Sequence, residues 1–204
     1  VRTHTHTLVF DTGAKLSDQF DMGSAVVVPF LQINGVRKVD TLLISHADND
    51  HIGGAQSVLH AMPVAEIITS VPQAFAQQHA SLCEAGRSWV WDHAQFDVLY
   101  PPAGQVASKN DNSCVLRVTL GTHRLLLTGD IERRSERYLL NTGTDLRTEI
   151  LVAPHHGSKT SSIAEFVTAT HPSKVLFAIG YRNRYPFPHP SVLARYQQAG
   201  ALWY

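Results

Sequence analysis

Four short apolar runs in this sequence end in residues that can carry chemistry. Runs of four to six residues rich in Val, Ile and Leu predict buried strands rather than helices. Polar groups at the carboxyl ends of strands are where α/β proteins build their sites. The pattern therefore predicts an α/β chain with one site at its strand ends. The runs are Thr7–Phe10, Asp40–Ser45, Leu125–Thr128 and Glu149–Ala153, and they lead into Asp11, His46, Asp130 and His155.

The composition limits the class of protein further. Hydrophobic residues make up 44% of the 204 residues, which excludes a disordered chain and allows a sizeable core. The apolar stretches are far shorter than the ~18 residues that a membrane span needs. Lys and Arg number 17 and so do Asp and Glu, so bulk charge does not favour nucleic-acid binding. Twelve histidines are the surplus that needs an explanation.

The remaining pattern mixes hairpins with strand–helix units and contains no repeat, which predicts a single domain over residues 1–204. The chain begins without Met and inside an expected strand, so we expect a fragment of a longer protein. Residues Val26–Leu31 fit either a helix or a short strand. An antiparallel hairpin is expected across Gly121-Thr122. Helices are expected at Gln56–Ala61, Ala74–Cys83, Glu132–Leu140, Ser162–Thr170 and Ser191–Ala199, and further strands at Glu66–Thr69, Trp89–Leu99 and Lys174–Ile179.

The two cysteines, Cys83 and Cys114, are too few for a disulfide framework or a cysteine zinc site. The sequence leaves open whether they form one disulfide or remain free thiols.

The densest group of possible ligands follows the second apolar run. Two imidazoles and two carboxylates in six residues suit Zn²⁺, Mn²⁺ or Fe²⁺. Their spacing in a turn lets His46 and Asp48 face one ion while Asp50 and His51 face a neighbouring one. The following Gly53-Gly54 allows close backbone approach. The alternative is a polar surface loop in which Asp50 caps a helix.

Four further groups lie at strand ends or beyond them. Asp130 can bridge two cations, although a simple turn residue is the alternative. Of the adjacent His155 and His156, one is expected to be a ligand and the other to support it or face substrate. Asp11 follows the first strand, and His189 lies in a proline-stiffened loop that can return to the same rim.

In this order, the residues resemble the metallo-β-lactamase superfamily. The family pattern opens with His-x-His-x-Asp-His, whereas Asp48 stands at the second His here. That departure resembles the C-terminal domain of ComEC-type competence proteins, which take up transforming DNA. The further matching segments are Asn110–Ser113, Leu126–Glu132, Pro154–Ser161 and Asn183–Pro190.

The resemblance implies an α/β (α+β) fold, a four-layer αββα sandwich truncated at its N-terminal edge, with two divalent metal ions between the sheets. The superfamily supplies another His from the middle of the chain, and only Asp111 or Asn112 lies near its place. A more oxygen-rich first site would favour Mn²⁺ over Zn²⁺. By position, His46 and Asp48 would bind the first ion, Asp50 and His51 the second, Asp130 would bridge, and His155 or His156 would complete the second site.

The function implied is hydrolysis of DNA phosphodiesters during competence, with single-stranded DNA as the expected substrate. The resemblance also implies a membrane channel elsewhere in the full-length protein, with this domain on the extracytoplasmic face of the inner membrane. The alternatives are a hydrolase of another ester (a lactone, thioester or phosphorylcholine) and a non-catalytic DNA-guiding module. In the catalytic reading, Asp50 orients or deprotonates water, His156 and His189 donate to phosphate or leaving group, Lys159, Arg182, Arg184 and Asn112 bind substrate, and Asp11 supports the ligands.

Overall fold

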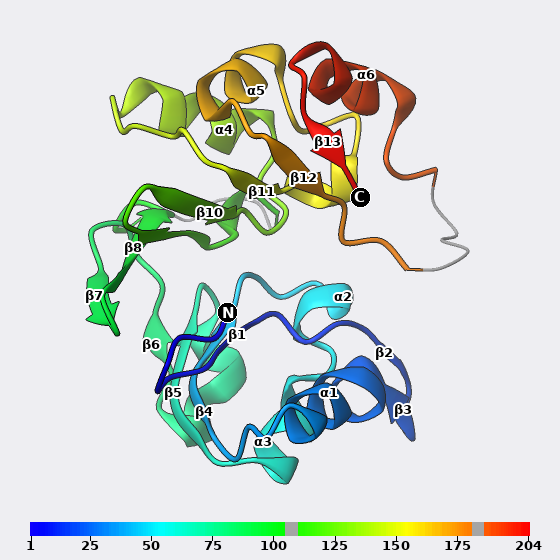
Figure 1. Cartoon of the computed structure of the whole chain (residues 1–204). Helices are drawn as coiled ribbons and strands as arrows, with labels where there is room; N and C mark the ends of the chain where they lie inside the picture. Colours follow the sequence, from blue (N-terminus) through cyan, green and yellow to red (C-terminus); the bar gives the residue numbers. More distant parts are fainter. Residues whose placement is uncertain (105–109, 181–185) are drawn as a thin grey trace.

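Two β-sheets pack face to face in the residues that the structure, a computed structural model, describes: 1–104, 110–180 and 186–204. Helices cover the outer face of each sheet, so the layers run helix, sheet, sheet, helix (Figure 1). This arrangement confirms the expected αββα sandwich. The helices over the larger sheet are α4 (Arg133–Asn141), α5 (Ala164–Thr170) and α6 (Pro190–Gln198), and those under the smaller sheet are α1 (Val28–Ile33) and α3 (Ala55–Ala61).

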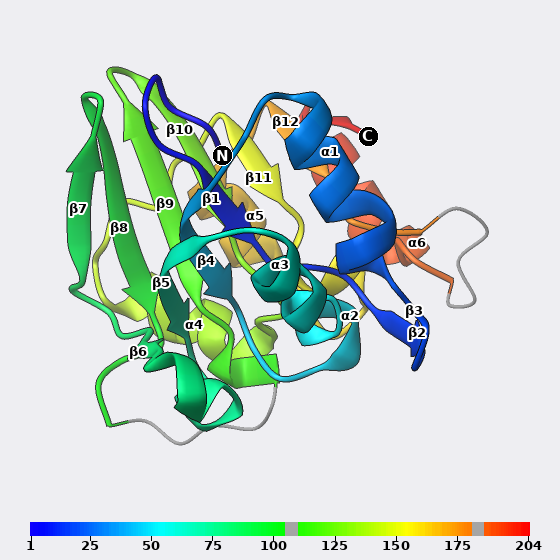
Figure 2. The ribbon, with the colours of Figure 1, turned by 90° about the horizontal axis from the view of Figure 1, so that it is seen from below.

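The smaller sheet is entirely parallel, with the strand order β1-β4-β5-β6. Its strands therefore end at one edge, and the short helix α2 (Asn49–Ile52) follows β4 there. Figure 2 shows α1 and α3 lying across the outer face of this sheet. The strands are β1 (Leu8–Phe10), β4 (Val39–Ile44), β5 (Val64–Thr69) and β6 (Ser81–Leu82), and a small separate hairpin pairs β2 (Lys15–Ser17) with β3 (Phe20–Asp21).

The larger sheet has the order β13-β12-β11-β10-β9-β8-β7. Strands β7 to β10 are antiparallel neighbours, whereas β10 to β13 run parallel. Leu120 pairs with His123, which confirms the hairpin expected across Gly121-Thr122. The strands are β7 (Ser88–Trp91), β8 (Ala94–Tyr100), β9 (Val115–Leu120), β10 (His123–Leu127), β11 (Ile150–Val152), β12 (Lys174–Leu176) and β13 (Leu202–Trp203).

Three apolar clusters fill the spaces between the four layers. Alternation along the strands decides which cluster each side chain joins, because successive strand residues point to opposite faces. In β4, Leu43 packs between the sheets against residues such as Phe96, whereas Leu42 and Ile44 pack toward the helices under the smaller sheet. In β10, Leu126 joins the cluster under α4, α5 and α6, and Leu127 points between the sheets.

Two local expectations are resolved or overturned. The helix expected over Ala74–Cys83 is wrong: a 3₁₀ segment η2 (Pro72–Gln78) takes its place and β6 follows. Phe75 has non-helical backbone angles, and His79 is left-handed, which ends the turn before a helix can form. The segment Val26–Leu31, which fitted either element, is helical: a π turn η1 (Gly23–Val27) leads into α1, whose first turn holds a proline.

The two cysteines form a disulfide. Cys83 follows β6 of the smaller sheet and Cys114 precedes β9 of the larger one, so the bond joins the two sheets. Both residues are fully buried, and their Cα atoms are 6.1 Å apart.

No helix among the described residues is both long and apolar enough to cross a bilayer.

Gly54 packs its backbone directly against the turn that holds Gly23. A Cβ atom at position 54 would overlap the backbone of Gly23 and the carbonyl of Thr12. This contact confirms the close approach expected for the glycines after the His46–His51 segment, and it presses that segment against the loop after β1.

We therefore expect Gly54→Ala to lower the free energy of unfolding by about 1–3 kcal/mol, since overpacked contacts cost that much. Chemical denaturation of the two proteins measures the change. Gly180→Ala is the matched control, because a Cβ there meets no described residue within 4 Å and its φ is not positive. Equal stability of Gly54→Ala and wild type would contradict this account of the packing.

Candidate metal centre

The ends of strands from both sheets meet at one cluster of acidic and imidazole side chains. Asp11 follows β1 and His46 follows β4, both in the smaller sheet. Asp130 follows β10, and His155 lies in the 3₁₀ turn η4 (Pro154–Gly157) after β11, both in the larger sheet. The residues that the sequence placed at strand ends are thus contributed by two separate sheets.

Asp130 lies at the centre of this cluster, with a side chain only 4% exposed. Its Oδ1 is 3.1 Å from Nε2 of His51 and 3.5 Å from Nε2 of His156. Its Oδ2 is 3.8 Å from Nε2 of His155 and 3.9 Å from Nε2 of His46. Each carboxylate oxygen therefore faces a different pair of imidazoles.

The two pairs extend into two groups of possible ligands. On the Oδ2 side, Asp48 reaches within 3.7 Å of Nε2 of His46. On the Oδ1 side, Asp50 lies 3.3 Å from Nε2 of His156 and 4.0 Å from Nε2 of His51. Asp48 occupies the N-cap position of α2 and Asp50 lies within its first turn, so Asp50 does not cap the helix as the alternative interpretation required.

All four imidazoles are fixed through their other ring nitrogen. Nδ1 of His51 contacts the Asp11 carboxylate at 2.7 Å, and Nδ1 of His46 contacts the Ser45 hydroxyl at 3.0 Å. The partners of the other two are Glu132, 3.0 Å from Nδ1 of His155, and the carbonyl of Ala178, 2.7 Å from Nδ1 of His156. With Nδ1 occupied, every Nε2 is directed toward Asp130, an arrangement typical of metal-binding histidines.

A buried orphan atom supports a metal at this position. His46 is 1% exposed, and its Nε2 has no hydrogen-bond partner among the described residues. A buried ring nitrogen without a partner costs free energy, which a metal ion would recover. Two sets of side chains place their ligand atoms within 4.8 Å of one another: His46, His51 and Asp130, and Asp50, His51 and His156. Imidazole and carboxylate donors in this mixture fit a divalent cation such as Zn²⁺ or Mn²⁺.

Three residues of the cluster hold left-handed backbone conformations that are unfavourable for side chains with a Cβ. Their φ angles are 58° for Asp11, 46° for His155 and 54° for His156. Each such residue costs of the order of 1 kcal/mol or more, and such strain concentrates at functional sites. Here it turns two adjacent imidazoles toward different oxygens of one carboxylate.

The charges of the cluster are tightly coupled. Burial lowers the pKa of His46, and the neighbouring His51 acts in the same direction. Burial also acts to lower the pKa of His51, but Asp11 and Asp130 overcome it and raise that pKa to about 11. The His156 hydrogen bond holds the pKa of Asp50 well below its usual value. Burial opposes ionisation of Asp130, yet His51 and the other imidazoles lower its pKa.

A pocket of about 450 Å³ opens onto the Oδ1 side of the cluster. One wall is polar and includes Asp50, His51, Asp130 and His156. Much of the remaining lining is apolar and includes Phe10 of β1 and, around η1, Met22, Val26 and Val27. A substrate in this pocket would present a polar group to the cluster and an apolar part to η1.

The other residues expected at the site make no described contact with the four imidazoles or Asp130, or lie outside the described residues. The imidazole of His189 caps α6 by accepting from the backbone N–H of Ser191, and its own backbone N–H donates to the carbonyl of Gly157 in η4. Asn112 donates to the carbonyl of Ser70, and its buried side-chain oxygen has no hydrogen-bond partner among the residues that the structure describes. Lys159 is exposed in the loop after η4. Arg182 and Arg184 lie outside the described residues.

Asp111, which the sequence suggested as a substitute for the middle His, instead accepts a hydrogen bond from the backbone N–H of Glu132. Other residues contribute to the site although the sequence analysis did not name them for that role. The proline-rich loop contributes the ring of Phe187, whose centroid lies 6.2 Å from that of His156, rather than the imidazole of His189. Ser45 directly precedes His46, and Glu132 lies two residues after Asp130. This proximity to expected ligands is a sequence signal for their supporting role.

Comparison with known proteins agrees with the geometry. The chain is 37% identical over 201 residues to competence protein ComA of Neisseria gonorrhoeae, covering 98% of this chain and 28% of ComA. It is 33% identical over 214 residues to ComE operon protein 3 of Bacillus subtilis, covering 94% of this chain and 28% of that protein. The chain therefore spans little more than a quarter of the length of these relatives.

Among solved structures, the metallo-beta-lactamase fold protein YhfI of Bacillus subtilis has a TM-score of 0.57 and 11% identity, covering 99% of this chain and 85% of YhfI. At that identity the match concerns the fold alone. The model of the metallo-beta-lactamase superfamily matches residues 1–178. With the two-sheet sandwich and the imidazole–carboxylate cluster at its strand ends, the chain belongs to the metallo-β-lactamase superfamily.

Proposed function

We propose that this chain is a metal-dependent phosphodiesterase domain that cleaves DNA during its uptake by competent cells. The observation that carries the proposal is Asp130, whose two oxygens each face a separate pair of imidazoles. A carboxylate in this position suits a bridge between two cations, and paired cations suit hydrolysis of a phosphodiester.

The candidate ligands would divide between two ions. His46, Asp48 and His155 would bind one ion, with Oδ2 of Asp130. In this assignment His155 takes the place of the middle His. Asp50, His51 and His156 would bind the other ion, with Oδ1 of Asp130. When bound, the two divalent ions would neutralise the phosphate and acidify a water molecule.

Two side chains of the chain itself are placed to move protons. Asp50 is 56% exposed, stays ionised through its contact with His156, and faces the pocket, so it can orient water and accept its proton. Hydrogen bonding to Asp50 overcomes burial and raises the pKa of His156 in the absence of an ion. Donation from His156 to a phosphate oxygen or to the leaving group is therefore the alternative to its role as a ligand, because Nδ1 contacts the carbonyl of Ala178 and Nε2 cannot both bind a cation and donate a proton. His189 would act by holding the η4 turn through its backbone contact with Gly157.

The proposed role in competence rests on the names of the relatives. This chain matches only 28% of the length of each of them. We propose that residues 1–204 form one domain of a longer DNA-uptake protein. Its membrane channel would lie in the remainder of that protein, and single-stranded DNA would be the substrate. The buried disulfide between Cys83 and Cys114 supports a position on the extracytoplasmic face of the inner membrane, because such bonds persist in oxidising compartments.

One observation favours a second candidate, hydrolysis of another ester such as a lactone or thioester. The wall of the pocket formed by Phe10, Met22 and Val26 is apolar, which suits an acyl chain as well as a deoxyribose or base.

Metal binding provides the first test of the ligand assignment. We expect wild type to bind two equivalents of Mn²⁺ or Zn²⁺, and Asp130→Ala to lose tight binding of both, since both groups share this carboxylate. Asp11→Asn should weaken binding by about 10–100-fold, because it removes the carboxylate that fixes His51. Titration calorimetry and elemental analysis measure both effects.

His60→Ala is the control for these variants, because His60 is exposed on α3. Retention of two tightly bound ions by Asp130→Ala would exclude the bridging role, and tight binding of zinc without activation by manganese would exclude a manganese enzyme.

Cleavage of DNA provides the second test. Labelled single- and double-stranded oligonucleotides are incubated with Mn²⁺, Zn²⁺ or a chelator, and products are separated by size. We expect metal-dependent cleavage that Asp50→Ala lowers by about 10²–10⁴-fold, the usual contribution of a general base. Asp18→Ala is the matched carboxylate control, since that side chain is 99% exposed.

Absence of metal-dependent cleavage, or full activity of Asp50→Ala, would falsify the nuclease mechanism. A lactone or thioester cleaved in place of DNA would establish the second candidate, and DNA binding without any cleavage would indicate a guiding module.

A further inference from the structure

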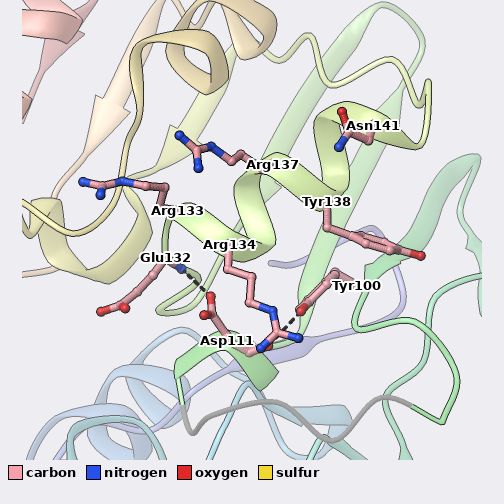
Figure 3. Close-up of a pocket in the computed structure, with 8 residues that line it drawn as sticks. All are labelled: Tyr100, Asp111, Glu132, Arg133, Arg134, Arg137, Tyr138 and Asn141. Atoms are coloured by element: carbon pink, nitrogen blue, oxygen red, sulfur yellow. Dashed lines mark hydrogen bonds between the residues drawn. The ribbon is translucent and has the colours of Figure 1, made fainter.

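Helix α4 presents three arginines beside the candidate metal centre. Arg133, Arg134 and Arg137 are all exposed, and they line a pocket of about 590 Å³. Figure 3 shows the pocket, with Arg134 directed toward the end formed by Tyr100 and Asp111. None of the sequence motifs at the strand ends includes these arginines.

The faces of α4 explain why all three arginines are exposed. Ser135, Glu136 and Leu139 are buried against the domain. The carboxylate of Glu136 accepts from the backbone N–H groups of Ser162 and Ile163, so it lies on the inner side of the helix. The outer side carries Arg134, Tyr138 and Asn141, at the i, i+4, i+7 spacing of one helical face.

The three guanidinium groups have no carboxylate partner within the described parts of the chain. Other arginines of the domain do: Arg87 pairs with Glu66, Arg117 with Asp97 and Arg124 with Asp145. Three unpaired positive charges within five residues repel one another, and an anion bound between them would relieve that repulsion.

The acidic residues in the pocket wall are already engaged. Oδ1 of Asp111 accepts from the N–H of Glu132 at 3.1 Å and from the hydroxyl of Ser135 at 2.7 Å, so this carboxylate caps the start of α4. Glu132 itself accepts from Thr160 at 2.8 Å and contacts Nδ1 of His155 at 3.0 Å. The outward-facing charge of α4 is therefore positive.

The pocket and the candidate metal centre share Glu132, which lines the first and contacts His155 in the second. The arginine-bearing face of α4 therefore adjoins the Oδ2 side of the cluster, where it could contact a strand whose phosphate lies at the cluster. Arginine binds phosphate through two parallel hydrogen bonds, and an exposed tyrosine ring such as Tyr138, 40% exposed, can stack on a base.

We propose that the outer face of α4, formed by Arg133, Arg134, Arg137 and Tyr138, binds the backbone phosphates of single-stranded DNA next to the scissile bond. This inference rests on the proposed function, and it gives a chain of zero net charge a local surface for a polyanion.

Equilibrium binding of DNA tests the role of α4 separately from DNA cleavage. A fluorescent 20-nucleotide single strand is titrated with the protein in chelator at several salt concentrations. We expect Arg134→Ala/Arg137→Ala to weaken binding at least about tenfold. The slope of log affinity against log salt should fall by about 1.4, since each phosphate contact contributes about 0.7 on single strands.

Two further proteins control the experiment. Arg37→Ala removes an exposed arginine just before β4, at the end of that strand away from the cluster, and should leave both affinity and slope unchanged. Arg134→Lys/Arg137→Lys keeps the charges and should restore the slope while recovering only part of the affinity, because lysine lacks the bidentate contact. Melting curves check that each variant is folded.

The outcomes separate this inference from the proposed function. Unchanged affinity and slope in the double alanine variant, or no binding by folded wild type, would overturn the role of α4 whether or not the protein cleaves DNA. Binding that depends on these arginines, without metal-dependent cleavage by wild type, would uphold α4 as a DNA surface and reject the nuclease.

Discussion

The contact of the Asp130 carboxylate with surrounding imidazoles is the interaction on which the rest of this structure depends. Four imidazoles approach it, two at each oxygen, and they come from strand ends in both sheets. A buried carboxylate would be unfavourable alone, and so would Nε2 of the buried His46, which has no hydrogen-bond partner in the described parts of the chain. Packing the sheets face to face brings these groups together, so the sandwich and the chemistry have one common requirement.

The surroundings of the imidazoles explain how this arrangement is maintained. Each Nδ1 contacts an oxygen from Asp11, Ser45, Glu132 or the Ala178 carbonyl. These contacts fix the ring orientations before any ligand binds, which reduces the reorganisation that binding would require. The left-handed backbone at His155 and His156 shows that the fold tolerates local strain to achieve this orientation.

Much of the fold and the position of the cluster could be predicted from the sequence, because strand ends and ligand spacing are local properties. The apolar runs before Asp11, His46, Asp130 and His155 indicated where the cluster lies. The turn signal at Gly121 was sufficient to predict the hairpin of β9 and β10. The directions of His155 and His156 were not predictable, since they depend on left-handed turns at residues other than glycine. The helix expected over Ala74–Cys83 failed because Ser81-Leu82 pairs with β5, a tertiary contact that outweighs helical propensity.

The division of the cluster between two sheets also affects the stability of the domain. His46 and His51 follow a strand of the smaller sheet, whereas Asp130, His155 and His156 belong to the larger one. A cation bound by both sets would act as a reversible cross-link at the open edge of the sandwich, in addition to the covalent one between Cys83 and Cys114. An ion present at 100 times its dissociation constant adds about 2.7 kcal/mol to the folded state. Metal supply would then regulate how long the domain survives as well as how fast it reacts.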